Sequence, residues 1–305
     1  MYDVIVIGGG PAGMTAALYA QRNGKNALVI EKAGFGGQIT HSPKVENYPG
    51  TYSMSGNEFA DHTLDQILRQ GAEIEIAEAV EVRDEGAKKV VVTEDGTEFE
   101  GKTVVIASGV KHRMLGLEGE EKLVGEGISF CAVCDGDFYA GKTVVVAGGG
   151  NSALQEAILL AEKCKKVILL QDLPAFTGEA KLQEVLFSKP NVEGITDTRI
   201  LRLVTEGERL TGVEFETRST SSGKRTVLCD GLFVAIGLIP ENKPFSPLAD
   251  LNEYGYFDSD ESCVTKTPGV FVAGDCRSKR IRQVATAIAD GAVAALAACR
   301  YIDMM

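Results

Sequence analysis

The 305-residue sequence predicts an α/β protein made of two similar domains, with the second domain inserted into the first. Three observations lead to this fold class. A glycine-rich loop follows an apolar segment at residues 8–13, and a loop of the same kind follows another apolar segment at residues 148–153. A C-terminal stretch, about residues 244–305, fits neither repeat and is too small to fold alone, so we assign it to the first domain.

The first repeat begins with a β-α-β unit. Residues 2–7 are apolar except for Asp3, as expected for a strand that is buried on both faces. The loop GGGPAG then opens a helix at residues 11–23, and a second strand at residues 27–30 ends at Glu31.

Local signals predict the rest of this repeat. The segment Ser55-Gly-Asn-Glu58 has the form of a capping box, and it opens a helix that runs to about residue 70, where Gly71 ends it. In the alternating stretch that follows, Asp95-Gly96 predicts a hairpin turn. The repeat closes with a strand that ends in Ala107-Ser108-Gly109.

The second repeat has strands, a glycine loop and helices in the same order as the first. A strand at residues 143–147 leads into the loop GGGNSA, and the repeat closes in Ala235-Ile236-Gly237. Between these points we expect a helix at 151–163, a strand at 167–170 and a helix at 179–188. We therefore divide the chain into a discontinuous first domain, residues 1–114 with 244–305, and an inserted domain, residues 115–243. The C-terminal stretch adds a small-residue helix at about residues 282–301.

Composition and net charge exclude several classes of partner and several cellular compartments. The net charge of −12 makes nucleic acid and anionic membrane surfaces poor partners. No segment has the roughly 18 continuous apolar residues that a membrane span needs, and the start of the chain lacks the pattern of a secretory signal. Seven cysteines argue against a secreted disulfide framework because the number is odd. We expect a protein of the reduced cytoplasm with no membrane and no nucleic-acid partner.

The first glycine loop predicts a dinucleotide site. Gly8, Gly10 and Gly13 have the spacing that permits a tight turn and a close approach of pyrophosphate to a helix N-terminus. Glu31 lies 31 − 8 = 23 residues further on, where a carboxylate can accept a hydrogen bond from a ribose hydroxyl. The alternative is a glycine-rich turn without a ligand.

The second loop predicts another nucleotide. Gly148, Gly150 and Ala153 repeat the pattern, with alanine in the third place as the motif permits. Asp172 follows the next strand and could bind a ribose diol, and no arginine lies nearby in the sequence to bind a 2′-phosphate. This favours NADH over NADPH. The alternative is that Asp172 is a solvated turn residue.

The cysteine pair in CAVCDG, Cys131 and Cys134, has three interpretations. A zinc site needs a second pair, and the remaining cysteines are isolated, so we expect no metal; they are Cys164, Cys229, Cys263, Cys276 and Cys299. Two buried structural thiols are possible, but the Asp-Gly that follows suggests a tight, accessible turn. A redox-active dithiol fits best. Asp135 could carry a proton to a departing thiolate, or it could simply be a turn residue.

Arg282 and Gln283 precede the last predicted helix. A helix N-terminus has free N–H groups and the positive end of a dipole, which would suit a reduced flavin anion. Ordinary helix capping is the alternative.

At this point the chain resembles the bacterial low-molecular-weight thioredoxin reductases. The segments GGGPAG, GFGGQIT…ENYPG (34–50), ASG (107–109), CAVCDG, GGGNSA and GVFVAGDC…RQVATA (269–287) follow the order found in that family over essentially the whole chain. The resemblance implies two Rossmann-like (three-layer ββα) dinucleotide-binding domains. It also implies a homodimer, with FAD on the discontinuous domain and a pyridine nucleotide on the insert.

The resemblance assigns residues to both cofactors. The implied FAD contacts are Gly8, Gly10, Pro11, Ala12, Gly13, Glu31, Gly37, Gln38, Asn47, Ala107, Gly109, Gly274, Asp275, Arg282, Gln283 and Val284. The pyridine-nucleotide contacts that we predict, which include the second loop and Asp172 from the pattern described above, are Gly148, Gly150, Asn151, Ser152, Ala153, Gln171, Asp172, Ile236 and Gly237.

A mechanism follows from the resemblance. Hydride passes from the nicotinamide to the flavin, which reduces the Cys131–Cys134 disulfide. Cys134 would face the flavin, Cys131 would attack the disulfide of thioredoxin or a thioredoxin-like protein, and Asp135 would act as acid and base. In the family the inserted domain rotates, so that nicotinamide and disulfide reach the flavin in turn.

The chain departs from the family at residues 171–177. Members that use NADPH carry an HRRxxxR stretch there, whereas this chain reads QDLPAFT, without the arginines that would grip a phosphate. NADH is therefore the expected donor. The alternatives are reduced ferredoxin as donor, a small-molecule dithiol oxidase that uses oxygen, and a flavin-bound redox sensor without turnover.

Overall fold

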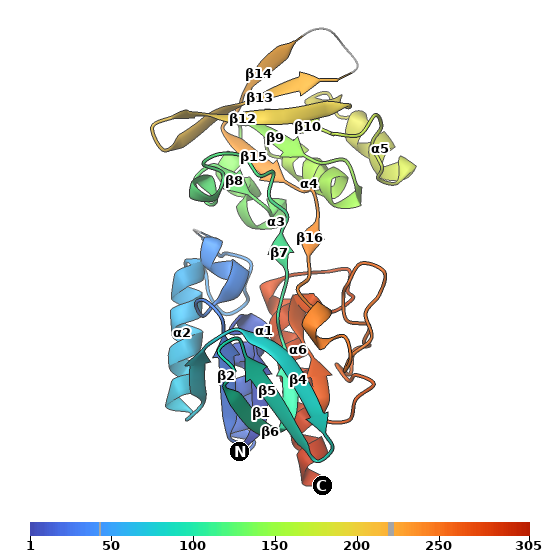
Figure 1. Ribbon diagram of the computed structural model, residues 1–305. Helices are drawn as coiled ribbons and strands as arrows, with labels where there is room; N and C mark the ends of the chain where they lie inside the picture. The colour runs from blue at the N-terminus through green and yellow to red at the C-terminus, as the bar shows by residue number, and fades with distance from the viewer. Residues whose placement is uncertain (43, 219–222) are drawn as a thin grey trace. The chain divides into compact units, whose positions relative to one another are not determined.

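Figure 1 shows the computed structural model, which describes residues 1–42, 44–218 and 223–305. The chain forms two compact units: unit 1 comprises residues 1–111 and 239–305, and unit 2 comprises residues 112–238. The chain crosses twice from one unit to the other, through the short strands β7 (Lys111–His112) and β16 (Leu238–Ile239), and these strands pair with each other. The two boundaries predicted from the sequence lie a few residues further along, at 114–115 and 243–244.

Unit 1 is built on a seven-stranded sheet in the order β3-β2-β1-β6-β5-β4, with β17 beside β6. The core strands are parallel, and β5 pairs antiparallel with both β6 and β4. The strands are β1 (Tyr2–Ile7), β2 (Ala27–Glu31), β3 (Glu73–Ile76), β4 (Ala79–Glu85), β5 (Lys88–Thr93), β6 (Glu98–Ile106) and β17 (Val270–Val272). The helices are α1 (Pro11–Arg22), α2 (Gly56–Arg69) and α6 (Val284–Asp303), with 3-10 turns η1 (Gly37–His41), η4 (Lys243–Phe245) and η5 (Gly274–Cys276).

Strand β1 is buried on both faces, as predicted. Successive side chains of a strand point to opposite faces of the sheet. Val4 and Val6 pack in the cluster formed with the helices, and Ile5 and Ile7 pack in the cluster on the side of the β4–β5 hairpin. Unit 1 therefore has helices on one face of its parallel strands, while the β4–β5 hairpin, which continues the same sheet through β6, packs against the other face.

Unit 2 repeats this architecture. Its central sheet is parallel, in the order β11-β10-β9-β15-β8, and a separate antiparallel sheet has the order β12-β13-β14. The strands are β8 (Ile128–Ser129), β9 (Thr143–Ala147), β10 (Lys166–Leu170), β11 (Val192–Ile195), β12 (Thr198–Glu206), β13 (Arg209–Thr217), β14 (Lys224–Leu228) and β15 (Gly231–Val234). The helices are α3 (Ala132–Asp135), α4 (Asn151–Ala161) and α5 (Ala180–Phe187), with 3-10 turns η2 (Glu121–Leu123) and η3 (Gly136–Tyr139). The predicted α/β class with two Rossmann-like, three-layer ββα units is confirmed.

Two predicted local motifs are present. The Ser55 hydroxyl accepts a hydrogen bond from the Glu58 amide at 3.1 Å, and the Ser55 amide donates to the Glu58 carboxylate at 2.7 Å, which completes the capping box of α2. In the β5–β6 hairpin, Asp95 accepts from the Thr97 amide at 3.1 Å, and Gly96 takes a φ of 84°. Both motifs depend only on residues close in sequence, which is why the sequence predicts them.

Helix α6 is long and apolar enough to cross a membrane by length and composition alone. This is weak evidence, because the core helix of a soluble protein passes the same test. Ala294, Ala295 and Ala298 of α6 are fully buried. A Cβ atom at Gly291 would lie 2.1 Å from the Ala12 carbonyl oxygen, so glycine permits the close packing of α6 on α1.

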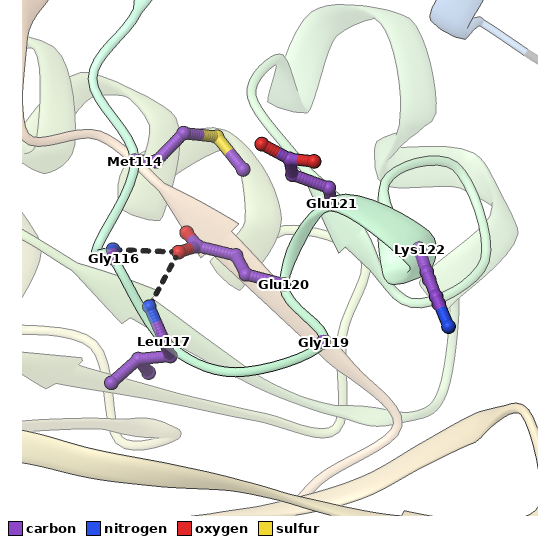
Figure 2. A pocket seen from close by; sticks show the side chains of 7 residues that line it. All are labelled: Met114, Gly116, Leu117, Gly119, Glu120, Glu121 and Lys122. Atoms are coloured by element: carbon purple, nitrogen blue, oxygen red, sulfur yellow. Dashed lines mark hydrogen bonds between the residues drawn. The ribbon is translucent and has the colours of Figure 1, made fainter.

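A pocket of about 220 Å³ lies in unit 2 along residues 114–122 (Figure 2). The buried Glu120 carboxylate accepts hydrogen bonds from the amides of Leu115 at 2.8 Å, Gly116 at 2.8 Å and Leu117 at 3.1 Å. Pockets that bind drug-sized ligands usually have volumes of about 300 Å³ or more, and this pocket is smaller. Because Glu120 accepts these three hydrogen bonds, we assign it the role of fixing the loop that follows β7.

Candidate active site

The first glycine loop combines two crowded positions with one open position. Gly8 has a φ of 106°, and a Cβ atom there would lie 2.3 Å from the Ala107 carbonyl oxygen. A Cβ atom at Gly13 would lie 1.8 Å from the Gly8 carbonyl oxygen. At Gly10, by contrast, the nearest heavy atom would be the Gly36 carbonyl oxygen, 4.0 Å away. The fold itself requires Gly8 and Gly13, whereas Gly10 leaves space that a ligand can use.

Glu31 lies beside this loop, at the end of β2. Its carboxylate accepts hydrogen bonds from the amide of Gly9 at 2.6 Å and from the amide of Ala33 at 2.9 Å. The side chain is half-buried, and each carboxylate oxygen, which already accepts one of these bonds, has a second lone pair. A ribose hydroxyl could donate to one of these lone pairs.

Asp275 offers an acceptor that no described residue satisfies with a hydrogen bond. It lies in η5, and its Oδ1 atom is buried, with the Lys279 ammonium 3.6 Å away and no hydrogen-bond partner in the described part of the chain. Burial raises the pKa of this carboxyl, although Lys279 and Arg282 act in the opposite direction. An unpaired buried acceptor costs free energy unless a donor reaches it, so the side chain fits a hydroxyl-bearing cofactor such as FAD.

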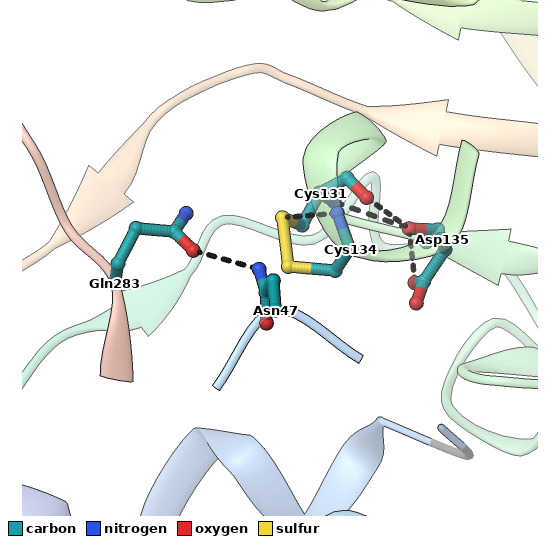
Figure 3. Close-up of a disulfide and its surroundings, with 6 residues drawn as sticks. Asn47, Cys131, Cys134, Asp135 and Gln283 are labelled. Carbon is teal, nitrogen blue, oxygen red and sulfur yellow. Dashed lines mark hydrogen bonds between the residues drawn. A yellow bond between two sulfur atoms is a disulfide. The ribbon is translucent and has the colours of Figure 1, made fainter. Parts of the chain in front are cut away.

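The remaining predicted FAD contacts lie in the same unit. Gly274 and Gly37 border the loop: a Cβ at Gly274 would lie 2.7 Å from the Ala12 Cβ, and a Cβ at Gly37 would lie 3.4 Å from the Gly10 Cα. Gln283 is the N-cap of α6, and its side-chain oxygen accepts a hydrogen bond from the side-chain amide nitrogen (Nδ2) of Asn47 at 3.2 Å (Figure 3). Gln38 is exposed in η1.

Arg282 is held next to Asp275. Its Nε donates to the Asp275 carbonyl oxygen at 3.2 Å, and its guanidinium lies 4.2 Å from the centroid of the Tyr256 ring. Ala107 and Gly109 follow β6, and Val284 begins α6.

The second glycine loop has the geometry of the first. Gly148 has a φ of 129°, and a Cβ atom there would lie 2.4 Å from the Ala235 carbonyl oxygen. Ala235 therefore takes the place that Ala107 has in unit 1, and the internal repeat extends to this contact. Gly150 is open, since its nearest neighbour would be the Thr177 hydroxyl at 3.9 Å. Asn151, Ser152 and Ala153 form the first turn of α4, while Ile236 and Gly237 follow β15.

The strand register places Gln171, and not Asp172, at the position of Glu31. Ile7 of β1 is opposite Ile30, and Ala147 of β9 is opposite Leu170, so the residues that follow are Glu31 and Gln171. Gln171 is buried: it accepts from the Asp172 amide at 3.1 Å and donates to the Ala175 carbonyl at 3.3 Å. Counting from the strand would have revealed this from sequence.

Asp172 is exposed, and an arginine from a distant segment reaches its backbone. Arg218, which follows β13, donates from Nη1 to the Asp172 carbonyl oxygen at 2.7 Å. From the sequence we expect no arginine near this point. No local signal connects two residues that are 46 positions apart, so sequence reasoning missed Arg218.

Cys131 and Cys134 form a disulfide at the start of α3, with their Cα atoms 5.3 Å apart (Figure 3). Cys131 is the N-cap, and its sulfur accepts from the Cys134 amide at 3.2 Å. The expected tight Asp-Gly turn is instead a one-turn helix followed by η3, because Cys131 caps the chain into helical geometry. Both cysteines are half-buried, and Val133 between them is 56% exposed.

Asp135 lies directly beside the disulfide in sequence and in the same helix. Its Oδ2 accepts from the Ser129 hydroxyl at 2.6 Å, while its Oδ1 is buried and has no partner in the described residues. Burial raises the pKa of this carboxyl, and the Ser129 hydrogen bond partly offsets the increase. A carboxyl with a raised pKa beside two sulfur atoms can exchange protons with them.

The other five cysteines are all buried free thiols. Burial raises the pKa of Cys164 and Cys276 to about 11 and that of Cys229 and Cys263 to about 12, and it also raises that of Cys299. The thiolate is the reactive form of cysteine, so these side chains are inert near neutral pH. Within the described part of the chain, no group of three or more His, Cys, Asp or Glu side chains could hold a metal ion.

Comparisons with known proteins agree with this geometry. Residues 2–291 match the family described as pyridine nucleotide-disulphide oxidoreductase. The chain is 38% identical over 304 residues to the thioredoxin reductase of Listeria innocua, which covers 99% of this chain and 94% of that protein. It is 40% identical over 301 residues to the 34.2 kDa protein in the rubredoxin operon of Clostridium pasteurianum, covering 98% of this chain and 97% of that one. The crystal structure of the thioredoxin reductase from Streptococcus pyogenes superimposes with a TM-score of 0.94 at 35% identity, over 100% of this chain and 99% of that chain.

Proposed function

This chain belongs to the thioredoxin reductases within the pyridine nucleotide-disulphide oxidoreductase family, and from that premise we propose that it reduces the disulfide of thioredoxin or a thioredoxin-like protein. The observation that carries the proposal is the Cys131–Cys134 disulfide with Asp135 at its side, in the same unit as an intact nucleotide-type glycine loop. Among the seven cysteines, these two alone are paired, and the others are buried thiols with raised pKa values.

The family implies FAD and a pyridine nucleotide as cofactors. The open space at Gly10, the half-buried Glu31 and the unsatisfied Asp275 oxygen support FAD binding in unit 1. When bound, FAD supplies a carrier that accepts two electrons from a pyridine nucleotide and delivers them to a disulfide. The loop at Gly148–Ala153 in unit 2 supports nucleotide binding there.

We assign the chemistry of the disulfide to three residues. Cys134 receives electrons, Cys131 attacks the disulfide of the protein partner, and Asp135 exchanges the protons that the two sulfur atoms gain and lose. The exposed Val133 supplies an apolar contact next to Cys131 for that partner.

NADH is the donor that we propose. Residues 171–177 contain no arginine, and the carboxylate of Asp172 repels a phosphate. Arg218 is the group that could reverse this preference, because its guanidinium lies at the Asp172 backbone. We further propose that the protein acts as a homodimer in a reduced cytoplasm, in agreement with its buried free thiols.

The test is anaerobic flavin bleaching in a stopped-flow instrument, with NADH and NADPH mixed in turn, followed by turnover with oxidised thioredoxin. Fast bleaching by NADH and slow bleaching by NADPH support the assignment of the donor. The reverse order overturns it and points to Arg218 as the phosphate ligand, which Arg218→Ala then checks by weaker binding of NADP⁺ at unchanged binding of NAD⁺. If neither nucleotide bleaches the flavin, the pyridine nucleotide assignment fails, and reduced ferredoxin is the donor to try.

A further inference from the structure

Asp290 is a buried carboxylate in α6 to which the proposed chemistry assigns no role. Its Oδ2 atom accepts a hydrogen bond from the Gly274 amide at 3.0 Å and forms an ion pair with the Lys279 ammonium at 3.0 Å. Its Oδ1 atom forms an ion pair with the Arg277 guanidinium at 2.8 Å. One side chain of α6 therefore holds the chain on both sides of Asp275.

The Lys279 ammonium lies between two carboxylates. It is 3.0 Å from Asp290 Oδ2 and 3.6 Å from Asp275 Oδ1. Only the shorter distance is a hydrogen bond, so Asp290 holds the lysine, and Asp275 Oδ1 has no hydrogen-bond partner in the described residues. The Lys279 side chain is only 13% exposed, and a charge in such a place is strongly unfavourable without a partner of opposite sign.

The two arginines of this segment are held by other groups. Arg282 donates from Nε to the Asp275 carbonyl oxygen and from Nη2 to the Arg277 carbonyl oxygen, both at 3.2 Å. Arg277 donates from Nε to the Ser259 hydroxyl at 2.8 Å. Lys279, with its long flexible side chain, is therefore the cation of this segment that can exchange one carboxylate for the other.

We propose that Asp290 is a positioning residue for FAD, which holds the Lys279 ammonium away from Asp275 and so keeps Asp275 Oδ1 free to accept a hydrogen bond from the cofactor. This inference rests on the proposed function, in which FAD binds to unit 1. Without the Asp290 carboxylate, Lys279 loses its nearer partner and moves to Asp275 Oδ1, the carboxylate oxygen 3.6 Å away. A hydroxyl of FAD then has to displace an ion pair before Asp275 can accept from it.

The test measures the affinity of flavin-free protein for FAD, by fluorescence titration at pH 8, far above the usual range of a carboxyl. Asp290→Asn should bind FAD about tenfold or more weakly than the wild type, because Lys279 then occupies the acceptor that the cofactor needs. Lys279→Met leaves that acceptor open and should bind FAD within about threefold of the wild type.

The double variant Asp290→Asn/Lys279→Met distinguishes this role from a merely structural one. Both Asp290→Asn and the double variant lack the carboxylate that holds Gly274 and Arg277, so a difference between them reports on the lysine alone. The double variant should bind FAD more tightly than Asp290→Asn does, because no ammonium is left to occupy Asp275 Oδ1. If Asp290 served only to stabilise the fold, the second substitution would weaken binding further or leave it unchanged.

Asp250→Asn is the matched control, because it removes the exposed ion pair with Lys266, at 2.7 Å, in the same unit. It should bind FAD as the wild type does. Thermal unfolding of each flavin-free variant separates a loss of affinity from a loss of fold. The proposal is wrong if Asp290→Asn has wild-type affinity, or if the double variant binds no more tightly than Asp290→Asn.

Two variants that keep Asp290 decide the question if Asp290→Asn does not fold. The forked guanidinium introduced by Lys279→Arg can contact both carboxylates at once. Lys279→Arg should therefore bind FAD more weakly than Lys279→Met. The opposite order would show that the site only needs a positive charge, and would overturn the proposal.

The wild-type titration separates this inference from the proposed function. Wild-type protein that binds no FAD overturns both, whereas tight wild-type binding with equal affinities in all variants overturns the role of Asp290 alone. Because the titration needs neither a nucleotide nor thioredoxin, a failure to reduce thioredoxin leaves it a valid test of Asp290.

Discussion

At the scale of single residues, the chain separates its two reactive cysteines from its inert ones by burial. Cys131 and Cys134 are half-buried at the start of a helix, whereas Cys229 and Cys276 are buried in places that raise their thiol pKa values. The spacing of the pair alone distinguishes it in the sequence. The structure explains why the other cysteines are unreactive, since a thiol that stays protonated is neither a nucleophile nor easily oxidised.

Replacing one cysteine of the pair should separate the two half-reactions, reduction of the flavin by the nucleotide and reduction of the protein disulfide. We expect Cys134→Ser to abolish turnover with thioredoxin, because no disulfide can then form, while the nucleotide still bleaches the flavin at a rate close to that of wild type. Stopped-flow absorbance and a thioredoxin reduction assay measure the two halves. Cys164→Ala, at a buried thiol of the same unit, is the control and should keep both activities. Turnover of a protein disulfide by Cys134→Ser would contradict the assigned roles.

At the scale of the secondary-structure elements, the turn from β1 to α1 carries two kinds of glycine. Gly13 is packed against the Gly8 carbonyl, whereas Gly10 is open and has φ −77° and ψ −177°, an extended conformation that any residue can adopt. The fold therefore requires Gly13, whereas we propose that Gly10 serves the ligand.

This difference predicts opposite outcomes for two alanine variants. Gly13→Ala should destabilise the protein by roughly 1–3 kcal/mol, as expected for an overpacked site. Gly10→Ala should leave the melting temperature of the flavin-free protein unchanged and greatly weaken its affinity for FAD, because the methyl group occupies space that the pyrophosphate needs. Thermal unfolding of flavin-free protein and FAD titration by fluorescence measure these effects. If Gly10→Ala binds FAD as tightly as the wild type, the loop is not the FAD site.

Elements set by nearby residues could be predicted from sequence, and contacts between distant segments could not. The capping box at Ser55, the turn at Asp95-Gly96 and both glycine loops depend on short spacings that the sequence displays. The Arg218–Asp172 contact depends on how the end of β13 folds back onto the segment after β10. Because such a contact leaves no periodic or local pattern, Arg218 could not be singled out from sequence. The role predicted for Asp172 stays a prediction, and the strand register adds that Gln171 lies at the position equivalent to Glu31.

At the scale of the whole molecule, each unit has its own apolar core. The described residues of unit 1 form two clusters around its seven-stranded sheet, and those of unit 2 form two others around its five-stranded sheet. The chain passes between the units through β7 and β16, which pair side by side. Paired strands lie about 5 Å apart, so the two ends of unit 1 at this point can be joined by a short linker.

Removal of unit 2 should therefore leave a folded protein. We expect a variant in which a short glycine linker joins residues 111 and 239 to remain compact, to bind FAD, and to lack nucleotide-dependent bleaching, because the second glycine loop is gone. Gel filtration, circular dichroism and the flavin absorbance spectrum test this. An aggregated variant without flavin would show that unit 1 needs the insert to fold, and fast bleaching by NADH would show that unit 1 holds the nucleotide itself.

The adjacent crossings at β7 and β16 also bear on how such proteins can diversify. A single stretch of the gene, codons 112–238, encodes both the dithiol and the nucleotide loop, and its two ends meet at one place in the fold. Recombination at those two points would exchange the electron donor and the disulfide chemistry together, as one heritable cassette, and would leave the flavin scaffold unaltered. A lineage could thus change its source of reducing power in one genetic event, without rebuilding the part of the protein that holds the flavin.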